Sequence, residues 1–288
     1  MWTWAAAAAF AALLVGGLAV FSERELPAAR SYFFGLDRLS SPARATDTVV
    51  IIGTSKTRCA VEPDAVLAAR TARLGQALRF VRITRDEATA DDFPEVFAAV
   101  TRSRPRLVLI ESDLLAYEPK VYRNLAATPR RDWRKTIRDM AQYALKRGSF
   151  YTAAAENRAV PHERTCRYGD GDPVARRAAL ATRSASTAAD RAPFMAFIAA
   201  LHDAGTPVAL LRFPRRMDAI GEVPPALEAA GEAVRRGLLH DPGITDLGQP
   251  VQISSDDFSG VHLDPRGRAQ YSAWLAGRIA ATLRPPAR

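Results

Sequence analysis

Cysteine and histidine are scarce in this chain of 288 residues, which has 2 of the first and 4 of the second. Cys59 and Cys166 are too few for a disulfide-dense scaffold or a cysteine-rich zinc site. We expect two buried free thiols, and the alternative is one disulfide if the domain lies outside the cytoplasm. Three of the histidines, His162, His202 and His240, lack metal-ligand spacing. The sequence therefore predicts no metal site and no cofactor.

Glycine motifs that bind phosphate are also missing. Residues 53–57 read Gly-Thr-Ser-Lys-Thr, which is not the G-x-x-x-x-G-K-[ST] of a P-loop, and no G-x-G-x-x-G follows a strand pattern. The net charge of +9 suits anionic glycans, phosphate-rich envelope surfaces or nucleic acid, but it also suits a solvated basic surface without a specific partner. Because no basic-aromatic recognition motif accompanies the charge, we expect no nucleic-acid partner.

Charged side chains are absent from residues 1–21. At ~1.5 Å per residue, a helix over this segment is about long enough to span a bilayer, and Trp2 and Trp4 suit its interface. We interpret the segment as an uncleaved transmembrane anchor, with a signal peptide as the alternative. Arg24 and Arg30 come after it and no basic residue precedes it, so the positive-inside rule weakly opposes export of the C-terminal domain.

Beyond a juxtamembrane connector at 22–46, strand and helix patterns alternate through a domain at 47–288. Strands are predicted at 48–53, 78–83, 107–111 and 207–213, and helices at 63–74, 91–102, 194–204, 224–239 and 265–283. This alternation predicts an α/β fold, namely a flavodoxin-like three-layer α/β/α sandwich with a mainly parallel sheet, in addition to the N-terminal transmembrane helix.

The stretch at 118–189 interrupts this alternation and is interpreted as an inserted cap over the carboxyl ends of the strands. It contains a basic helix candidate at 131–147, in which Trp133, Met140 and Tyr143 accompany the arginines. That helix is compatible with an amphipathic contact to a membrane or glycan surface. The other interpretation is the solvated outer face of a lid.

Two positions suggest a catalytic site. Ser55 comes shortly after the β-branched run that ends at Gly53, and the carboxyl ends of parallel strands are where open α/β sheets bind ligands. His262 precedes the last predicted helix, which has Asp264 as its N-cap and Pro265 at its first position. A serine hydroxyl needs a neighbouring base, and an imidazole with a pKa of ~6.5 suits that role, so the pair predicts a nucleophile and its general base.

These motifs resemble the SGNH (GDSL-like) hydrolase superfamily, especially its membrane-anchored envelope members linked to O-acylation of polysaccharides. The segment 53–55 is similar to the first block of the family, and Gly260-Val261-His262-Leu263 with Gly267 is similar to the last block. The resemblance covers about 47–111 and 190–283. It implies a serine esterase or O-acyltransferase for acyl esters, acetyl esters foremost, of a cell-envelope polysaccharide. It further implies an extracytoplasmic domain on a single-pass membrane anchor, and a membrane-bound acyltransferase as a partner.

The orienting carboxylate of the family departs from its usual position. The last block is usually DxxH, and Ser259 stands where the aspartate is expected. Asp257 lies two residues further upstream and is the candidate to orient His262, next to Asp256. The alternative is a serine–histidine dyad in which a backbone carbonyl holds the imidazole. An orienting carboxylate can be worth ~10⁴ in rate, so the difference matters.

This sequence also departs from the oxyanion hole of the family, which uses a glycine and an asparagine. The chain has two asparagines, Asn124 and Asn157, and neither comes directly after a predicted core strand. The candidate oxyanion donors are therefore the backbone N–H groups of Ser55 and of Thr84 or Arg85.

Charged residues around Ser55 are candidates for substrate binding. Lys56 and Arg58 are predicted to bind an anionic sugar or phosphate, with plain solvation as the alternative, and Asp113 comes after the third predicted strand. The missing DxxH aspartate and asparagine also favour a second hypothesis. In that hypothesis the domain is catalytically inactive and binds acidic polysaccharide or scaffolds a membrane acylation complex.

Overall fold

The computed structural model describes residues 17, 35–40, 47–84, 93–117, 184–214, 216, 224–259 and 262–284. Apart from residue 17, all of these belong to one unit formed by Phe33–Pro119 and Pro161–Arg288. Strands and helices alternate along most of this unit, as the sequence predicts.

A central sheet of five parallel strands organises this unit, in the order β2-β1-β3-β4-β5. The strands are β1 (Thr48–Gly53), β2 (Arg79–Thr84), β3 (Leu107–Glu111), β4 (Val208–Leu211) and β5 (Ile244–Asp246). Every residue of β1 and β3 is buried, because helices cover both faces of the sheet. The strand order is the flavodoxin-like one, so the predicted fold class is confirmed for the described residues.

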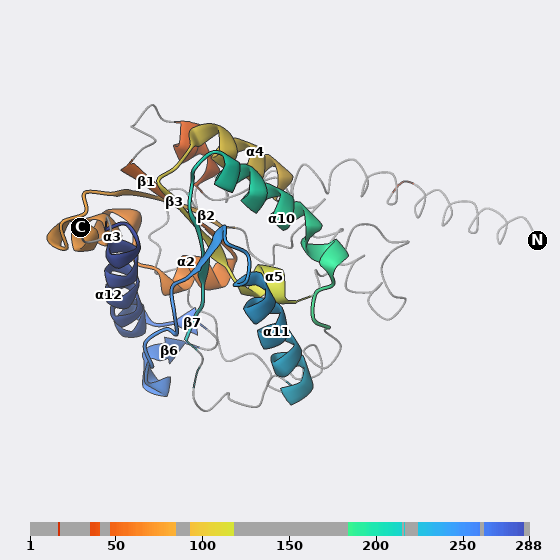
Figure 1. Cartoon of the computed structure of the whole chain (residues 1–288). Coiled ribbons are helices and arrows are strands. Elements are labelled where there is room, and N and C mark those ends of the chain that lie inside the picture. The colour runs from red at the N-terminus through yellow and green to blue at the C-terminus, as the bar shows by residue number, and fades with distance from the viewer. Residues whose placement is uncertain are drawn as a thin grey trace, which may run out of the picture. The chain divides into compact units, whose positions relative to one another are not determined.

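Helices cover both faces of the sheet (Figure 1). On one face, α4 (Pro94–Ser103), α10 (Ala188–Asp203) and α11 (Pro225–Leu238) pack against alternate strand residues such as Val50 and Ile110. On the other face, α3 (Asp64–Arg73) and α12 (Pro265–Thr282) pack against the intervening residues, such as Ile51 and Leu109. Successive side chains of a strand point to opposite faces, so each strand contributes to both cores.

Helix α10 begins earlier than the sequence predicts. The expected start at Phe194 comes after Pro193, but the helix begins at Ala188 and includes the proline. A capping box explains this start: the Thr187 hydroxyl accepts from the Asp190 N–H, and the Asp190 carboxylate accepts from the Thr187 N–H.

The structure adds short elements that the sequence patterns do not predict. Two helices, α2 (Ser55–Ala60) and α5 (Asp113–Ala116), come directly after β1 and β3. The 3₁₀ turn η1 (Leu36–Ser40) precedes β1. A second 3₁₀ turn, η6 (Ser255–Asp257), precedes the antiparallel pair of β6 (Phe258–Ser259) and β7 (His262–Leu263). These elements are too short for a hydrophobic period to reveal.

Several predictions lie outside the described residues. They are the anchor at 1–21 apart from residue 17, most of the connector at 22–46, and nearly all of the cap at 118–189. Within the described ranges, no helix combines the length and the apolar character that crossing a bilayer demands.

The prediction of two free thiols is wrong for Cys59, which is disulfide-bonded. The other cysteine of the chain, Cys166, lies outside the described residues. The prediction used the general tendency of free cysteine to be buried, and Cys59 is indeed buried, but burial does not distinguish a thiol from a disulfide.

Candidate active site

Ser55 occupies a sharp turn between the central strand β1 and helix α2. Gly53 is the last residue of β1, Thr54 caps α2 with an extended backbone, and Ser55 is the first helical residue. We call residues 53–57 the Ser55 turn. It lies at the carboxyl edge of the sheet between β1 and β3, which is where the strand order reverses and where this fold class binds ligands.

His262 reaches the Ser55 turn from the far end of the chain. Its Nε2 lies 3.4 Å from the Ser55 Oγ, although 207 residues separate the two positions. Strand β7 carries His262, and both β7 and α12 contact α2 (Figure 1). The separation is at the long end of a hydrogen bond, as is common for catalytic pairs without substrate. The structure thus brings the predicted nucleophile and base together.

The imidazole of His262 is held neutral. Burial, followed by the positive charges of Lys56 and Arg58, lowers the pKa of His262 from 6.5 to about 4. A neutral ring is the form that can accept a proton, so the group is in the basic form throughout the neutral pH range. The same causes disfavour the imidazolium that forms when it takes the serine proton.

A buried carboxylate, Glu111, lies beneath the Ser55 turn. It is the last residue of β3 and is 1% exposed. Its Oε2 accepts hydrogen bonds from the Thr54 N–H at 2.7 Å and the Thr57 hydroxyl at 2.8 Å, and the Thr54 hydroxyl lies 3.0 Å from both carboxylate oxygens. Burial raises the pKa of Glu111, Lys56 lowers it and Asp113 raises it further. The motifs did not identify this residue, although a carboxylate that ends an apolar run was a signal for it.

The backbone N–H groups of the Ser55 turn differ in the acceptors to which they donate. The Thr54 N–H donates to Glu111, and the Lys56 N–H donates to the Thr54 hydroxyl at 3.2 Å. Ser55 is the first helical residue, so its N–H has no acceptor one turn back, and no hydrogen bond of this group is found in the described part of the chain. It is the amide of the turn best placed to receive an oxyanion.

The other proposed oxyanion donors lie on the neighbouring strand. Thr84 is the last residue of β2, is buried, and pairs with Gly53 in the register of the sheet. It therefore lies at the same edge as Ser55. Arg85 lies outside the described residues.

The Asp257 carboxylate is directed toward helix α12. Its Oδ2 accepts from the Gln270 amide at 2.8 Å, and its Oδ1 lies 3.4 Å from the Arg266 guanidinium. The Asp257 carbonyl also accepts from the Asp264 N–H, which holds this loop against the start of α12. Ser259 pairs with His262 across the β6–β7 hairpin. The role predicted for Asp257 in orienting His262 remains a prediction.

Three charged residues predicted to bind substrate lie in the Ser55 turn or close to it. Lys56 forms an ion pair with Asp113 at 2.7 Å, and Asp113 also lies 3.4 Å from Arg235 of α11. Arg58 is almost buried, and its carbonyl accepts from Arg82. Lys56 is the most exposed of the three and the one best able to contact a ligand from solvent.

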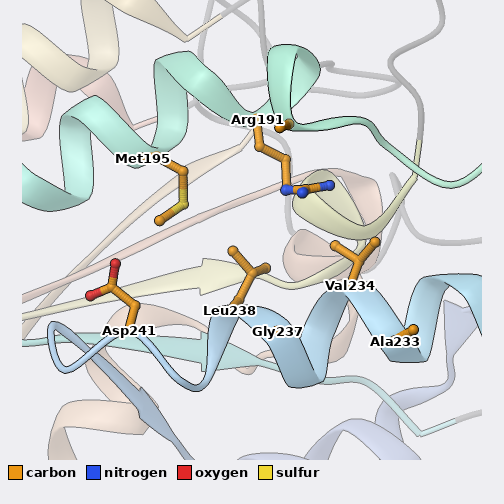
Figure 2. A pocket seen from close by; sticks show the side chains of 8 residues that line it. Arg191, Met195, Ala233, Val234, Gly237, Leu238 and Asp241 are labelled. Atoms are coloured by element: carbon orange, nitrogen blue, oxygen red, sulfur yellow. The ribbon is translucent and has the colours of Figure 1, made fainter.

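A separate hollow of about 570 Å³ lies between helices α10 and α11 (Figure 2). Arg191 and Met195 of α10 face Val234 and Leu238 of α11 across it, with Asp241 at one side (Figure 2). Neither Ser55 nor His262 lines this hollow. The candidate chemistry is therefore not located there.

No family model and no curated protein matches the chain. Three solved structures are similar to this chain. They are a protein from Bacteroides fragilis that is described as an acylhydrolase, the protein TesA, and a GDSL-like lipase from Bacteroides thetaiotaomicron. Their sequence identities are 12%, 13% and 11%, and their TM-scores are 0.42, 0.43 and 0.41. The alignments cover 86%, 82% and 91% of this chain and 94%, 99% and 100% of the others. The case for an activity rests on the site itself.

Proposed function

We propose that the chain is a serine esterase or O-acyltransferase that acts on acyl esters, acetyl esters foremost, of a cell-envelope polysaccharide. The observation that carries the proposal is the pairing of the Ser55 Oγ with the His262 Nε2 at 3.4 Å, at the strand-order reversal of a parallel sheet. A hydroxyl beside a neutral imidazole is the arrangement that activates serine for attack on a carbonyl carbon.

The reaction proceeds in two halves. His262 Nε2 removes the Ser55 proton while Oγ bonds to the acyl carbon, and the carbonyl oxygen becomes an oxyanion that faces the Ser55 N–H. The intermediate collapses, the C–O bond to the leaving alcohol breaks, and His262 returns the proton to that alcohol. Water or a sugar hydroxyl then attacks the acyl-serine by the same steps in reverse. Hydrolysis results in the first case and acyl transfer in the second.

The charges near Ser55 support an acidic polysaccharide as substrate. Lys56 and Arg58 are close enough to lower the pKa of His262, so they also place positive potential where an acyl ester would lie. In this proposal Lys56 contacts an anionic sugar group and Asp113 holds the lysine in position. On an acetylated polyuronate, Lys56→Gln is expected to raise KM several-fold, with no change in KM on an acetylated neutral glycan.

An extracytoplasmic location on a membrane anchor at 1–21 is part of the proposal, with a membrane-bound acyltransferase as the partner. The disulfide at Cys59 supports this location, because disulfides persist mainly outside the cytoplasm. An alkaline phosphatase fusion after residue 30 tests it. Active phosphatase is the expected result, and an inactive fusion with an active β-galactosidase fusion at the same position would contradict it.

The experiment for the activity is turnover of 4-nitrophenyl acetate by the full chain and four variants. Ser55→Ala and His262→Ala are each expected to lower kcat/KM by at least ~10³-fold, because both remove a partner in the proton transfer. Ser103→Ala, at the end of α4, and His240→Ala, on an exposed turn after α11, are matched controls that should stay within about twofold of the parent. Equal loss in a control and its matched site variant would contradict the assignment.

The second candidate function is a catalytically inactive domain that binds acidic polysaccharide or scaffolds an acylation complex. One observation favours it: the Asp257 carboxylate contacts Gln270 and Arg266 of α12. Absence of turnover in the folded parent chain, together with binding of a polyuronate that Lys56→Gln weakens, would establish this alternative.

A further inference from the structure

A buried acid that serves no step of the proposed reaction lies directly below its nucleophile. Glu111 ends β3, the strand next to β1, and its carboxylate reaches across to the Ser55 turn. We propose that Glu111 is a positioning residue that holds Ser55 against His262 by accepting hydrogen bonds from Thr54 and Thr57. This inference rests on the proposed function, since it assigns Glu111 a role in that reaction.

The hydrogen bonds of Glu111 lie on both sides of the nucleophile. The Thr54 N–H precedes Ser55 by one residue and donates at 2.7 Å, and the Thr57 hydroxyl comes two residues after it and donates at 2.8 Å. Both donate to the same oxygen, Oε2. One buried acceptor therefore fixes the backbone before the serine and the first turn of α2 after it.

The sequence of the turn leaves room for this carboxylate. A Cβ on Gly53 would lie 2.6 Å from the Glu111 Oε2 and closer still to the Thr57 hydroxyl. Only glycine permits the carboxylate and the hydroxyl to approach the strand end so closely. One packed unit thus forms at the end of β1 from Gly53, the two threonines and Glu111.

The distance between Ser55 and His262 makes the rate sensitive to the position of the turn. The Ser55 Oγ and the His262 Nε2 are 3.4 Å apart, so a further displacement of the turn would break their hydrogen bond. Misplacement of a reacting group by about 1 Å costs on the order of 10²-fold in rate. Glu111 also occupies the Thr54 N–H, which leaves the Ser55 N–H as the amide that faces an oxyanion.

Isosteric variants separate positioning from charge. In Glu111→Gln, the amide oxygen can take the place of Oε2 and accept both bonds, and the amide NH₂ can donate to the Thr54 hydroxyl, so the unit stays complete. In Glu111→Leu, the Thr54 N–H and the Thr57 hydroxyl lose their acceptor. Thr57→Ser keeps the hydroxyl donor and Thr57→Val removes it at nearly constant shape.

The test measures the rate at which a fluorophosphonate probe labels the full chain, along with kcat and KM for 4-nitrophenyl acetate. Glu111→Gln and Thr57→Ser should stay within about threefold of the parent, whereas Glu111→Leu should lose about 10²-fold and Thr57→Val about tenfold. The loss should fall on kcat with KM nearly unchanged, because substrate does not touch Glu111. If Glu111→Leu does not fold, the two Thr57 variants carry the test.

Three outcomes are distinguishable. The predicted separation of Gln from Leu and of Ser from Val supports the inference. A parent chain that labels, with Thr57→Val and Glu111→Leu within threefold of it, overturns the inference and leaves the esterase intact. A folded parent that neither labels nor turns over overturns the proposed function and with it the catalytic role of Glu111. Deuterium exchange at residues 53–57 in the Glu111→Gln and Thr57→Val variants then shows separately whether the acid holds the turn.

Discussion

The two halves of the candidate site are built differently. In the serine half, buried or partly buried hydrogen bonds join the turn to two strands of the sheet. Glu111 of β3 accepts from Thr54 and Thr57, and the Arg82 guanidinium of β2 donates to the carbonyl of Val61 just after α2. The histidine half is a short hairpin before α12. The acid predicted to orient His262, Asp257, accepts from the Gln270 amide of α12 and lies close to the Arg266 guanidinium, which is largely exposed.

This difference indicates that the nucleophile is positioned more rigidly than the base. A catalytic pair needs both partners in place, so the less constrained partner governs how often the productive geometry forms. We therefore assign most of the fixed geometry to the β1–α2 turn. The histidine half is left open to adjustment by substrate, and substitutions in either half test that contrast.

Among substitutions outside the catalytic pair, the largest effect is expected from Gly53→Ala, which disrupts the serine half. The added methyl group would overlap with the Thr57 hydroxyl and the Glu111 carboxylate, so we expect about 2 to 3 kcal/mol lower stability and labelling slowed by about 10²-fold. Urea denaturation and probe kinetics measure these. Gly277→Ala, in α12 with open space around it, is the control and should stabilise the chain by about 0.5 to 1 kcal/mol. Equal behaviour of the two variants would refute the close packing below Ser55.

A smaller effect is expected in the histidine half from Asp257→Asn. The asparagine can still accept from Gln270, and the carboxylate is shared with Arg266, so we expect kcat/KM to fall roughly tenfold. A complete triad would lose ~10⁴ instead. Steady-state kinetics decide between the two values. A loss of the larger size would show that the hairpin rearranges to bring Asp257 onto His262.

The pH profile of kcat/KM tests whether the charge of Lys56, in the serine half, lowers the pKa of His262 in the histidine half. His262 must be neutral to act as the base, so kcat/KM should fall as the pH drops through its pKa of about 4. Lys56 lowers that pKa, and Lys56→Gln should therefore move the acid limb to higher pH, toward 6.5. Arg73→Gln removes one positive charge at the exposed end of α3 and is the control. A limb that does not move in Lys56→Gln contradicts the assigned cause.

The smallest effect is expected from Arg266→Gln, which sharpens the contrast. The guanidinium is mostly exposed, so its ion pair with Asp257 adds little stability. Its removal frees Oδ1 to turn toward the imidazole, and we expect kcat to rise by about twofold to threefold at unchanged melting temperature. A decrease in kcat would mean that Arg266 holds Asp257 where catalysis needs it.

Long apolar runs and their spacing made most of the fold predictable from the sequence. The runs at 48–53 and 107–111 became β1 and β3 with the predicted bounds, because strands buried on both faces are continuously apolar. Strand β5 was missed because only three residues pair, and two of them are exposed. The start of α10 was missed because the capping box of Thr187 and Asp190 was not recognised in the sequence.

The site was predictable where it depends on topology and not where it depends on loop conformation. Ser55 and His262 lie near the ends of one strand and one helix, and the fold brings such ends to one edge. The contacts of Asp257 depend on the β6–β7 hairpin, which no hydrophobic period specifies. Glu111 was a visible acid at a strand end, but its partners are known only once β1 and β3 are neighbours.

The most direct measurement is the site of covalent modification by a fluorophosphonate. The full chain is labelled, digested and analysed by mass spectrometry, beside Ser55→Ala and His262→Ala. We expect a single adduct on Ser55 that disappears in both variants. An adduct on another serine, or no adduct on the folded parent chain, would contradict the assignment of Ser55 as a nucleophile activated by His262.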